Sequence, residues 1–200
     1  VKANVDGEKR WRYILVQLPE PVDDLQFSTI AEISRERIRR ACIGFQERLT
    51  DVLTDNAGIA QDLGFKVFKL SSSNIKPWDA DFDSLDQDLV QAVDNIKPDR
   101  TEDDVLYELL LKYGLDLAIP TETRHIEGRK VTVIGAGALI VCLADDITLD
   151  VVSGIVALKA EFQPEVMRVV FKDAGFKDDV VKTNAAQILK QAGIDDVKSL

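Results

Sequence analysis

The stretch Arg10-Trp11-Arg12-Tyr13-Ile14-Leu15-Val16-Gln17-Leu18-Pro19-Glu20 decides the expected fold of this chain. Tyr13 to Leu18 is a short, nearly continuous apolar run with aromatic and β-branched members, and Pro19 ends it. Such a run is typical of a strand that is buried on both faces. The sequence therefore predicts a strand from about Trp11 to Leu18 in a parallel sheet.

A long helix is predicted directly after this strand, from about Thr29 to Thr54. Thr29 stands three residues ahead of Glu32, so each side chain can satisfy a backbone amide at a helix start. Apolar residues then recur at helical spacing, at Ile30, Ile33, Ile38, Ala41, Phe45 and Leu49. A buried strand, a polar loop and an amphipathic helix form half of a βαβ unit, which predicts an α/β fold.

The middle of the chain predicts one more strand and a pair of helices. Phe65 to Leu70 alternates apolar residues with lysines, as an edge strand does. Polar turn formers between Ser71 and Asp81 mark a boundary, and Trp78 within it is expected to anchor the linker on apolar surface. The helical pair covers Leu85 to Ile96 and, with Thr101 as its cap, the segment up to Tyr113. Its wide leucine-rich surface predicts contact with another chain.

The last 80 residues predict a hairpin or meander followed by a parallel βαβ unit. The expected elements are strands at Thr123–Ile126, Lys130–Ile134, Leu139–Leu143 and Val166–Phe171, and helices after Thr148 and from Asp178 to Ala192. We expect the last eight residues to be mobile. The predicted domains are a partial Rossmann-like sheet over 1–72, a linker with the helical pair over 73–120, and a small α/β domain over 121–200.

Composition limits the classes of function. The chain is 46% hydrophobic, has no apolar run near the roughly 20 residues that a membrane helix needs, and lacks a secretory leader pattern, so we expect a cytoplasmic protein. Its two cysteines, Cys42 and Cys142, have no ligand-spaced partner and predict neither zinc nor a disulfide. The net charge of −10 opposes DNA binding by this chain alone.

Several stretches resemble the modification subunit of type III restriction-modification systems, which are adenine-specific DNA methyltransferases. The similar segments are Tyr13–Glu20, Thr29–Arg40, Gly64–Leu70, Ser73–Asp79, Leu106–Gly114 and Val169–Asp173. They run the whole length of the chain but correspond only to the C-terminal portion of that family. The first residue, Val1, also suits a fragment or a processed form. The resemblance implies S-adenosylmethionine as cofactor, a homodimer, and a restriction subunit as a further partner.

Methyl transfer in that family needs two motifs that this sequence lacks. One is a Phe-x-Gly-x-Gly turn for the methionine moiety, and the other is an Asp-Pro-Pro-Tyr-type tetrad for a flipped adenine. We therefore expect no catalytic residue here, no tight cofactor binding by this chain alone, and DNA contacts through the part that would precede Val1. Gly135-Ala136-Gly137 lacks a third glycine at the right spacing and predicts only a turn or bulge.

Gln17 and Glu20 are the two candidate cofactor contacts. Related methyltransferases place an acidic residue at this strand end, where it accepts hydrogen bonds from the cofactor ribose. Gln17 departs from that pattern, since a neutral amide accepts without the charge that strengthens the bond. Glu20 in the following loop offers the missing carboxylate. The competing interpretation is a solvated strand end.

Other residues that could suggest a functional site are interpreted as structural. His125 is expected to be a surface strand residue, and Arg35, Arg37, Arg39 and Arg40 a solvated helix face. Asp145-Asp146 and Asp178-Asp179 stand where helix starts attract carboxylates, which argues against a metal site. Two hypotheses remain for the whole chain: a C-terminal part of the methyltransferase, or a stand-alone non-catalytic dimerisation module.

Overall fold

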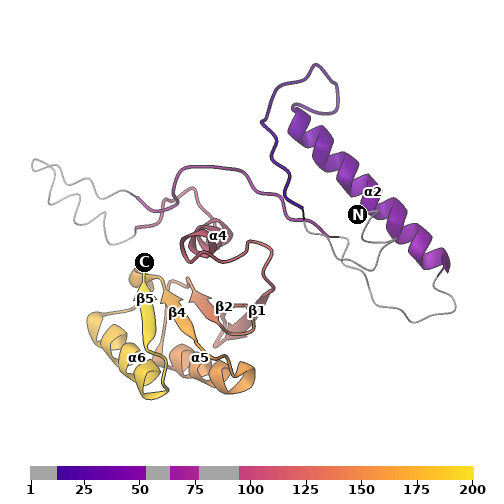
Figure 1. Cartoon of the computed structure of the whole chain (residues 1–200). Helices are drawn as coiled ribbons and strands as arrows, with labels where there is room; N and C mark the ends of the chain where they lie inside the picture. The colour runs from indigo at the N-terminus through magenta and orange to yellow at the C-terminus, as the bar shows by residue number, and fades with distance from the viewer. Residues whose placement is uncertain (1–12, 53–63, 77–94) are drawn as a thin grey trace, which may run out of the picture. The chain divides into compact units, whose positions relative to one another are not determined.

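The structure is a computed structural model that describes residues 13–52, 64–76 and 95–200. It divides into two compact units, Val1–Phe68 and Lys69–Leu200 (Figure 1). The predicted helix at Leu85–Ile96 and Trp78 lie almost wholly outside the described residues. No helix among the described residues is long and apolar enough to cross a membrane.

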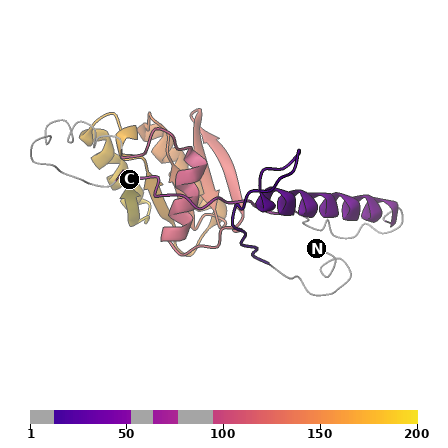
Figure 2. The ribbon, with the colours of Figure 1, turned by 90° about the horizontal axis from the view of Figure 1, so that it is seen from above.

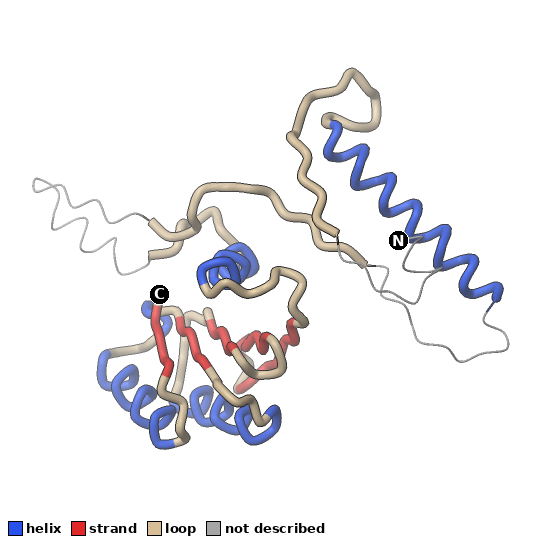
Figure 3. Tube along the Cα trace, viewed as in Figure 1, coloured by secondary structure: helices blue, strands red, loops and turns tan. Residues whose placement is uncertain are grey.

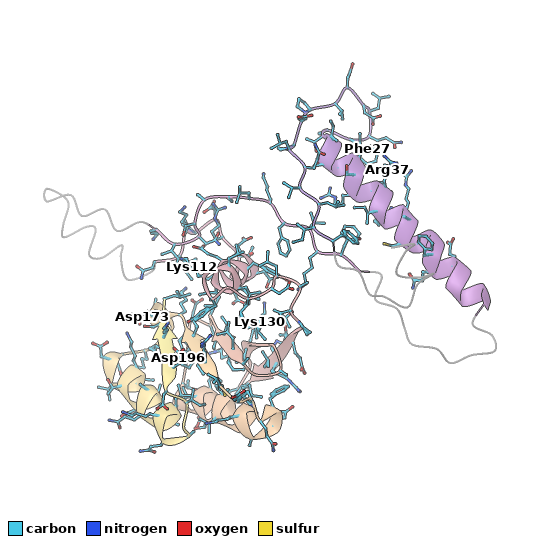
Figure 4. The ribbon with its side chains drawn as sticks, viewed as in Figure 1. Phe27, Arg37, Lys112, Lys130, Asp173 and Asp196 are labelled. Atoms are coloured by element: carbon cyan, nitrogen blue, oxygen red, sulfur yellow. The ribbon has the colours of Figure 1, made fainter. Side chains whose placement is uncertain are left out.

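The first unit contains the predicted long helix, α2 (Ile30–Val52). The amide of Glu32 donates to Thr29 Oγ1 at 3.3 Å, while the Glu32 carboxylate accepts from the amide of Ser28 at 2.7 Å. Both side chains thus satisfy backbone groups at the helix start, as the sequence predicted. The arginine face is exposed, and Arg37 is marked on it in Figure 4.

The two strands predicted in the first part of the chain are absent from the described structure. Residues 13–18 and 65–70 have no assigned strand and are drawn as loop in Figure 3. Ile14 is 91% exposed and Val16 is 90% exposed, so this run is not buried. The prediction of a buried strand here was wrong for the described residues, because an apolar pattern shows what could be buried but supplies no neighbouring strand to pair with.

The second unit is an α/β domain with a five-stranded mixed sheet in the order β1-β2-β3-β4-β5. Its strands are β1 (Thr121–Ile126), β2 (Arg129–Ile134), β3 (Leu139–Cys142), β4 (Arg168–Phe171) and β5 (Asp196–Ser199). The first three strands form an antiparallel meander, one of the two arrangements predicted, and β3, β4 and β5 are parallel. Glu127 and Gly128 turn the β1–β2 hairpin with positive φ angles of 50° and 73°.

The parallel half follows the predicted strand–helix order. Helix α5 (Leu149–Phe162) links β3 to β4, and α6 (Asp179–Gln191) links β4 to β5. Because both crossovers run in the same direction along the sheet, the right-handed rule puts both helices on one face. Their core includes Ile140, Val169 and Phe171 from the sheet, Val151 and Ile155 from α5, and Leu189 from α6.

The opposite face of the sheet is covered by α4 (Glu102–Lys112), which lies over the strands in Figures 1 and 2. Leu106, Leu109 and Leu110 of this helix are buried with Ile134 and Val141 of the sheet. Only Leu111 remains well exposed, at 62%. The wide leucine-rich surface expected for a second chain is therefore largely used inside this domain, and α4 shares a core with residues 121–200 although we expected a boundary at residue 120.

The chain end also differs from the prediction. We expected the last eight residues to be mobile, but β5 pairs with β4 and Ile194 is 1% exposed. The backbone of Leu200 donates to Phe171 O at 2.9 Å and accepts from the amide of Asp173 at 2.8 Å. A short charged strand carries a weak sequence signal, and its pairing with β4 stabilises it here.

Candidate functional site

The two residues predicted to contact a cofactor lie on the first unit and are exposed. Gln17 Nε2 donates to the neighbouring Leu18 carbonyl at 3.2 Å. The backbone carbonyl of Glu20 accepts from the amide of Ile30 at 3.0 Å, which ties the loop to the start of α2. Neither residue lines a described cavity, and their role as ribose contacts stays a prediction.

The described residues form a cavity of about 130 Å³ in the second unit, beside the carboxyl ends of β3 and β4. Open α/β sheets bind ligands at this edge, because the loops that follow parallel strands converge there. The cavity joins three segments of the chain, 96–105, 143–145 and the residue after β4. Its lining residues are Ile96, Arg100, Thr101, Glu102, Val105, Leu143, Asp145 and Lys172.

Lys172 directly follows β4 and brings a positive charge to this cavity. Its side chain is only 15% exposed, and its Nζ donates to Asp145 Oδ1 at 2.7 Å. Asp145 follows β3 and is 86% exposed. The pair therefore joins the segments after two adjacent parallel strands, with the lysine on the protein side and the carboxylate in solvent.

Arg100 brings the second positive charge, and its side chain is 20% exposed. Its Nη2 donates to Ser71 Oγ at 3.3 Å and Ser72 Oγ at 3.4 Å, and its Nη1 lies 3.3 Å from Asp99 Oδ2. The Nε atom is buried and makes no hydrogen bond among the described residues. A buried N–H of this kind costs free energy unless something pairs with it.

The start of α4 forms another wall of the cavity. Thr101 is the helix cap that the sequence predicted: its Oγ1 accepts from the amide of Asp104, and the Asp104 carboxylate accepts from the amide of Thr101, which completes a capping box. The backbone hydrogen bond from Thr101 lowers the pKa of Asp104. Glu102 lies 3.2 Å from Lys130 Nζ, so one carboxylate at the cavity already faces a cation.

Lys130 sits under the start of α4 and lines a much smaller cavity of about 10 Å³ (Figure 4). Burial lowers the pKa of its ammonium, but hydrogen bonds to Glu102 and Asp103 outweigh burial, so the net shift is upward. The lysine is therefore held charged between two carboxylates. This cavity is about the size of a water molecule and offers no room for a larger ligand.

A further charged pair lies next to the cavity, after β4. Lys182 of α6 donates to Asp173, and this hydrogen bond lowers the pKa of the Asp173 carboxyl. Figure 4 marks Asp173 near the carboxyl end of β5. This pair links α6 to the same edge of the sheet and does not line the cavity.

The other residues singled out in the sequence have structural roles. His125 is an exposed residue of β1, and Gly135 and Gly137 occupy a turn with φ angles of 59° and 90°. Asp178 caps α6 by accepting from the amide of Val181 at 2.8 Å. Cys42 and Cys142 are free, and no group of metal-ligating side chains occurs in the described part of the chain.

Comparison with known proteins leaves the family open: no family model matches this chain, and no curated protein matches it. The resemblance to type III modification subunits therefore stays a prediction from the residues themselves. The cavity, in contrast, rests on the geometry of the second unit alone.

Sequence reasoning missed the residues that form the cavity. Lys172 gave a usable signal, because it directly follows a predicted buried strand at the end where α/β sheets bind ligands. Arg100 gave none, since it lies in a polar turn between two predicted helices. Only the packing of α4 on the sheet brings it to the same edge.

Proposed function

We propose that this chain is the C-terminal part of the modification subunit of a type III restriction-modification system, an S-adenosylmethionine-dependent, adenine-specific DNA methyltransferase acting in the cytoplasm. The supporting observation is the run Tyr13–Leu18, which resembles a strand of that enzyme's cofactor domain and is exposed throughout. Consecutive exposed apolar residues of this kind favour burial against another surface. In this proposal the run completes the Rossmann-like sheet of the intact subunit.

The catalytic work belongs to the remainder of the subunit in this proposal. The 200 residues contain neither a Phe-x-Gly-x-Gly turn nor an Asp-Pro-Pro-Tyr-type tetrad. Gln17 and Glu20 would add ribose contacts to a cofactor that is held mainly elsewhere. The net charge of −10 likewise favours DNA contacts through other parts of the subunit.

The second unit would supply partner surface for a homodimer and for the restriction subunit. Because Leu106, Leu109 and Leu110 are buried, α4 has little apolar surface left for contact with a partner chain. Leu111, at 62% exposure, is the apolar side chain of this helix that a second copy can still reach. A Leu111→Glu variant that stays dimeric in light scattering would exclude α4 from the dimer interface.

The proposal is tested with the reading frame upstream of Val1 and with a paired variant. We expect that frame to encode the tetrad and then the glycine-rich turn. We also expect Ile14→Lys with Val16→Lys to abolish association of this chain with the separately produced remainder of the subunit. Leu25→Lys is the control, because Leu25 is equally exposed but lies outside the run. A frame that starts at Val1, or unchanged association of the double variant, would overturn the proposal.

The alternative function is a stand-alone, non-catalytic dimerisation module. It is favoured by the second unit, which has apolar cores on both faces of its sheet. This alternative predicts a homodimer that forms without any methyltransferase sequence. A monomer across micromolar concentrations in light scattering would count against it.

A further inference from the structure

We propose that the cavity at the carboxyl ends of β3 and β4 binds the phosphate group of a small sugar phosphate. This ligand class follows from the lining, which combines two cationic side chains, two carboxylates and three aliphatic side chains. The site goes beyond the methyltransferase proposal and does not depend on it, because every lining residue belongs to the second unit.

Arg100 supplies the strongest argument for an anion. Among the described residues, three arginines have a buried Nε without a well-directed hydrogen bond: Arg100, Arg124 and Arg168. Arg124 Nε nevertheless lies 2.8 Å from Glu122, and Arg168 Nε lies 3.0 Å from Asp196, so each has a carboxylate beside it. The closest carboxylate of Arg100, on Asp99, faces Nη1 instead. Arg100 therefore lines the cavity with a charge that has no carboxylate on Nε, and an oxyanion there would pair with its guanidinium.

Lys172 supplies the second cation, and its present partner can be exchanged for a ligand oxygen. Its partner Asp145 is 86% exposed, so this carboxylate can turn into solvent while Lys172, at 15% exposure, stays in the cavity wall. An incoming phosphate oxygen then replaces the carboxylate oxygen on Nζ. Such an exchange keeps the buried ammonium paired, which avoids the cost of an isolated charge.

The remaining lining residues favour a sugar phosphate over a free phosphate ion. Glu102 remains in the cavity lining when Asp145 turns away, and its carboxylate can accept hydrogen bonds from ligand hydroxyl groups. Ile96, Val105 and Leu143 form the apolar part of the lining. A volume of about 130 Å³ is below the size of pockets for drug-sized ligands, so the cavity holds the phosphate and the adjoining hydroxyls while the rest of the ligand lies outside.

The proposal is tested by NMR titration of the ¹⁵N-labelled 200-residue chain with ribose 5-phosphate, inorganic phosphate and ribose. We expect saturable shifts of the amides of Arg100, Thr101, Asp145 and Lys172 with ribose 5-phosphate. Inorganic phosphate should bind at the same amides but more weakly, and ribose should not shift them. Arg100→Met and Lys172→Met should each weaken binding about tenfold, the loss of one charge-assisted hydrogen bond.

Two controls separate ligand binding from folding. The Ser71→Ala and Ser72→Ala double variant removes the hydroxyl partners of Arg100 while its guanidinium remains, so binding should be kept. Lys198→Met removes a lysine that packs on Tyr113 outside the cavity and should also leave binding unchanged. No saturable shift up to about 10 mM, where binding energies are negligible, would overturn the proposal. Equal binding by Arg100→Met or equal shifts with ribose would overturn it as well.

Discussion

The carboxylate of Glu108 on α4 accepts a hydrogen bond from the backbone amide of Asn74 at 2.6 Å. Its other oxygen accepts from Ser73 Oγ, also at 2.6 Å, and lies 2.8 Å from Lys112 Nζ. Asn74 in turn donates from Nδ2 to Asp104 O, and Lys97 Nζ donates to Ser73 O. This network fixes the segment 71–76 on the outer side of α4, next to the Arg100 side of the cavity.

We predict that Glu108→Gln makes the domain less stable and changes its response to acid. Burial raises the pKa of Glu108, but Lys112, Ser73 and Asn74 outweigh it and bring the pKa from 4.5 to about 2. The ionised form is favoured by the fold, so its contribution is complete above pH 4.5 and is lost as the pH falls toward 2. At neutral pH we expect a loss of about 1 kcal/mol in the free energy of unfolding.

Urea unfolding at several pH values checks this prediction. The difference between wild type and Glu108→Gln should shrink between pH 4.5 and 2, because the wild-type carboxylate is neutralised there. Glu165→Gln is the matched control, since Glu165 is exposed. A constant difference across this range would contradict the assigned role of the Glu108 charge.

We predict that Lys159→Met, a substitution on the neighbouring helix α5, destabilises α6. Lys159 is on α5, and its Nζ donates to Ala192 O at 2.8 Å and Gly193 O at 2.7 Å, where the carbonyls at the end of α6 would lack partners. Loss of these bonds should cost about 1–3 kcal/mol. Hydrogen exchange of the α6 amides measures the effect. Lys190→Met, at an exposed position in the last turn of α6, should change the exchange rates of these amides far less.

We predict that Gly175→Ala is strongly destabilising. A Cβ at this position would lie 2.2 Å from the carbonyl oxygen of Ala144 and 2.9 Å from Ile147 Cδ1, so backbone must move to admit it. Overpacking of this kind costs about 1–3 kcal/mol. Gly114→Ala meets nothing within 4 Å and suffers only from its φ of +67°, so it should cost about 1–2 kcal/mol. Equal melting temperatures for wild type and Gly175→Ala would contradict the close packing of Gly175 against Ala144 and Ile147.

We predict that two neighbouring leucines of α4 respond differently to truncation. Leu110 is 0% exposed and packs against the sheet, whereas Leu111 is 62% exposed. Leu110→Ala should lower the free energy of unfolding by about 2–5 kcal/mol through lost burial and the cavity it leaves. Leu111→Ala should stay within about 0.5 kcal/mol of wild type. Similar losses for both variants in urea unfolding would mean that Leu111 is covered in solution.

Local sequence patterns determined most elements of the second unit. Thr101 and Asp104 mark the start of α4, Glu127-Gly128 marks the hairpin, and Thr148 and Asp178 mark the starts of α5 and α6. Each signal works through contacts within a few residues, so the sequence alone carries it. The alternation of buried strands and helices then led to the parallel arrangement of β3 and β4.

Only the tertiary structure decided which apolar runs are paired and where the cavity lies. Tyr13–Leu18 has the composition of a buried strand but no strand beside it among the described residues, while the less apolar Asp196–Ser199 pairs with β4. A strand is stabilised by a neighbour that can be far away in sequence, and the strand's own residues do not specify that neighbour. The cavity has the same origin, because Arg100, Asp145 and Lys172 come together only when α4 and two parallel strands pack into one domain.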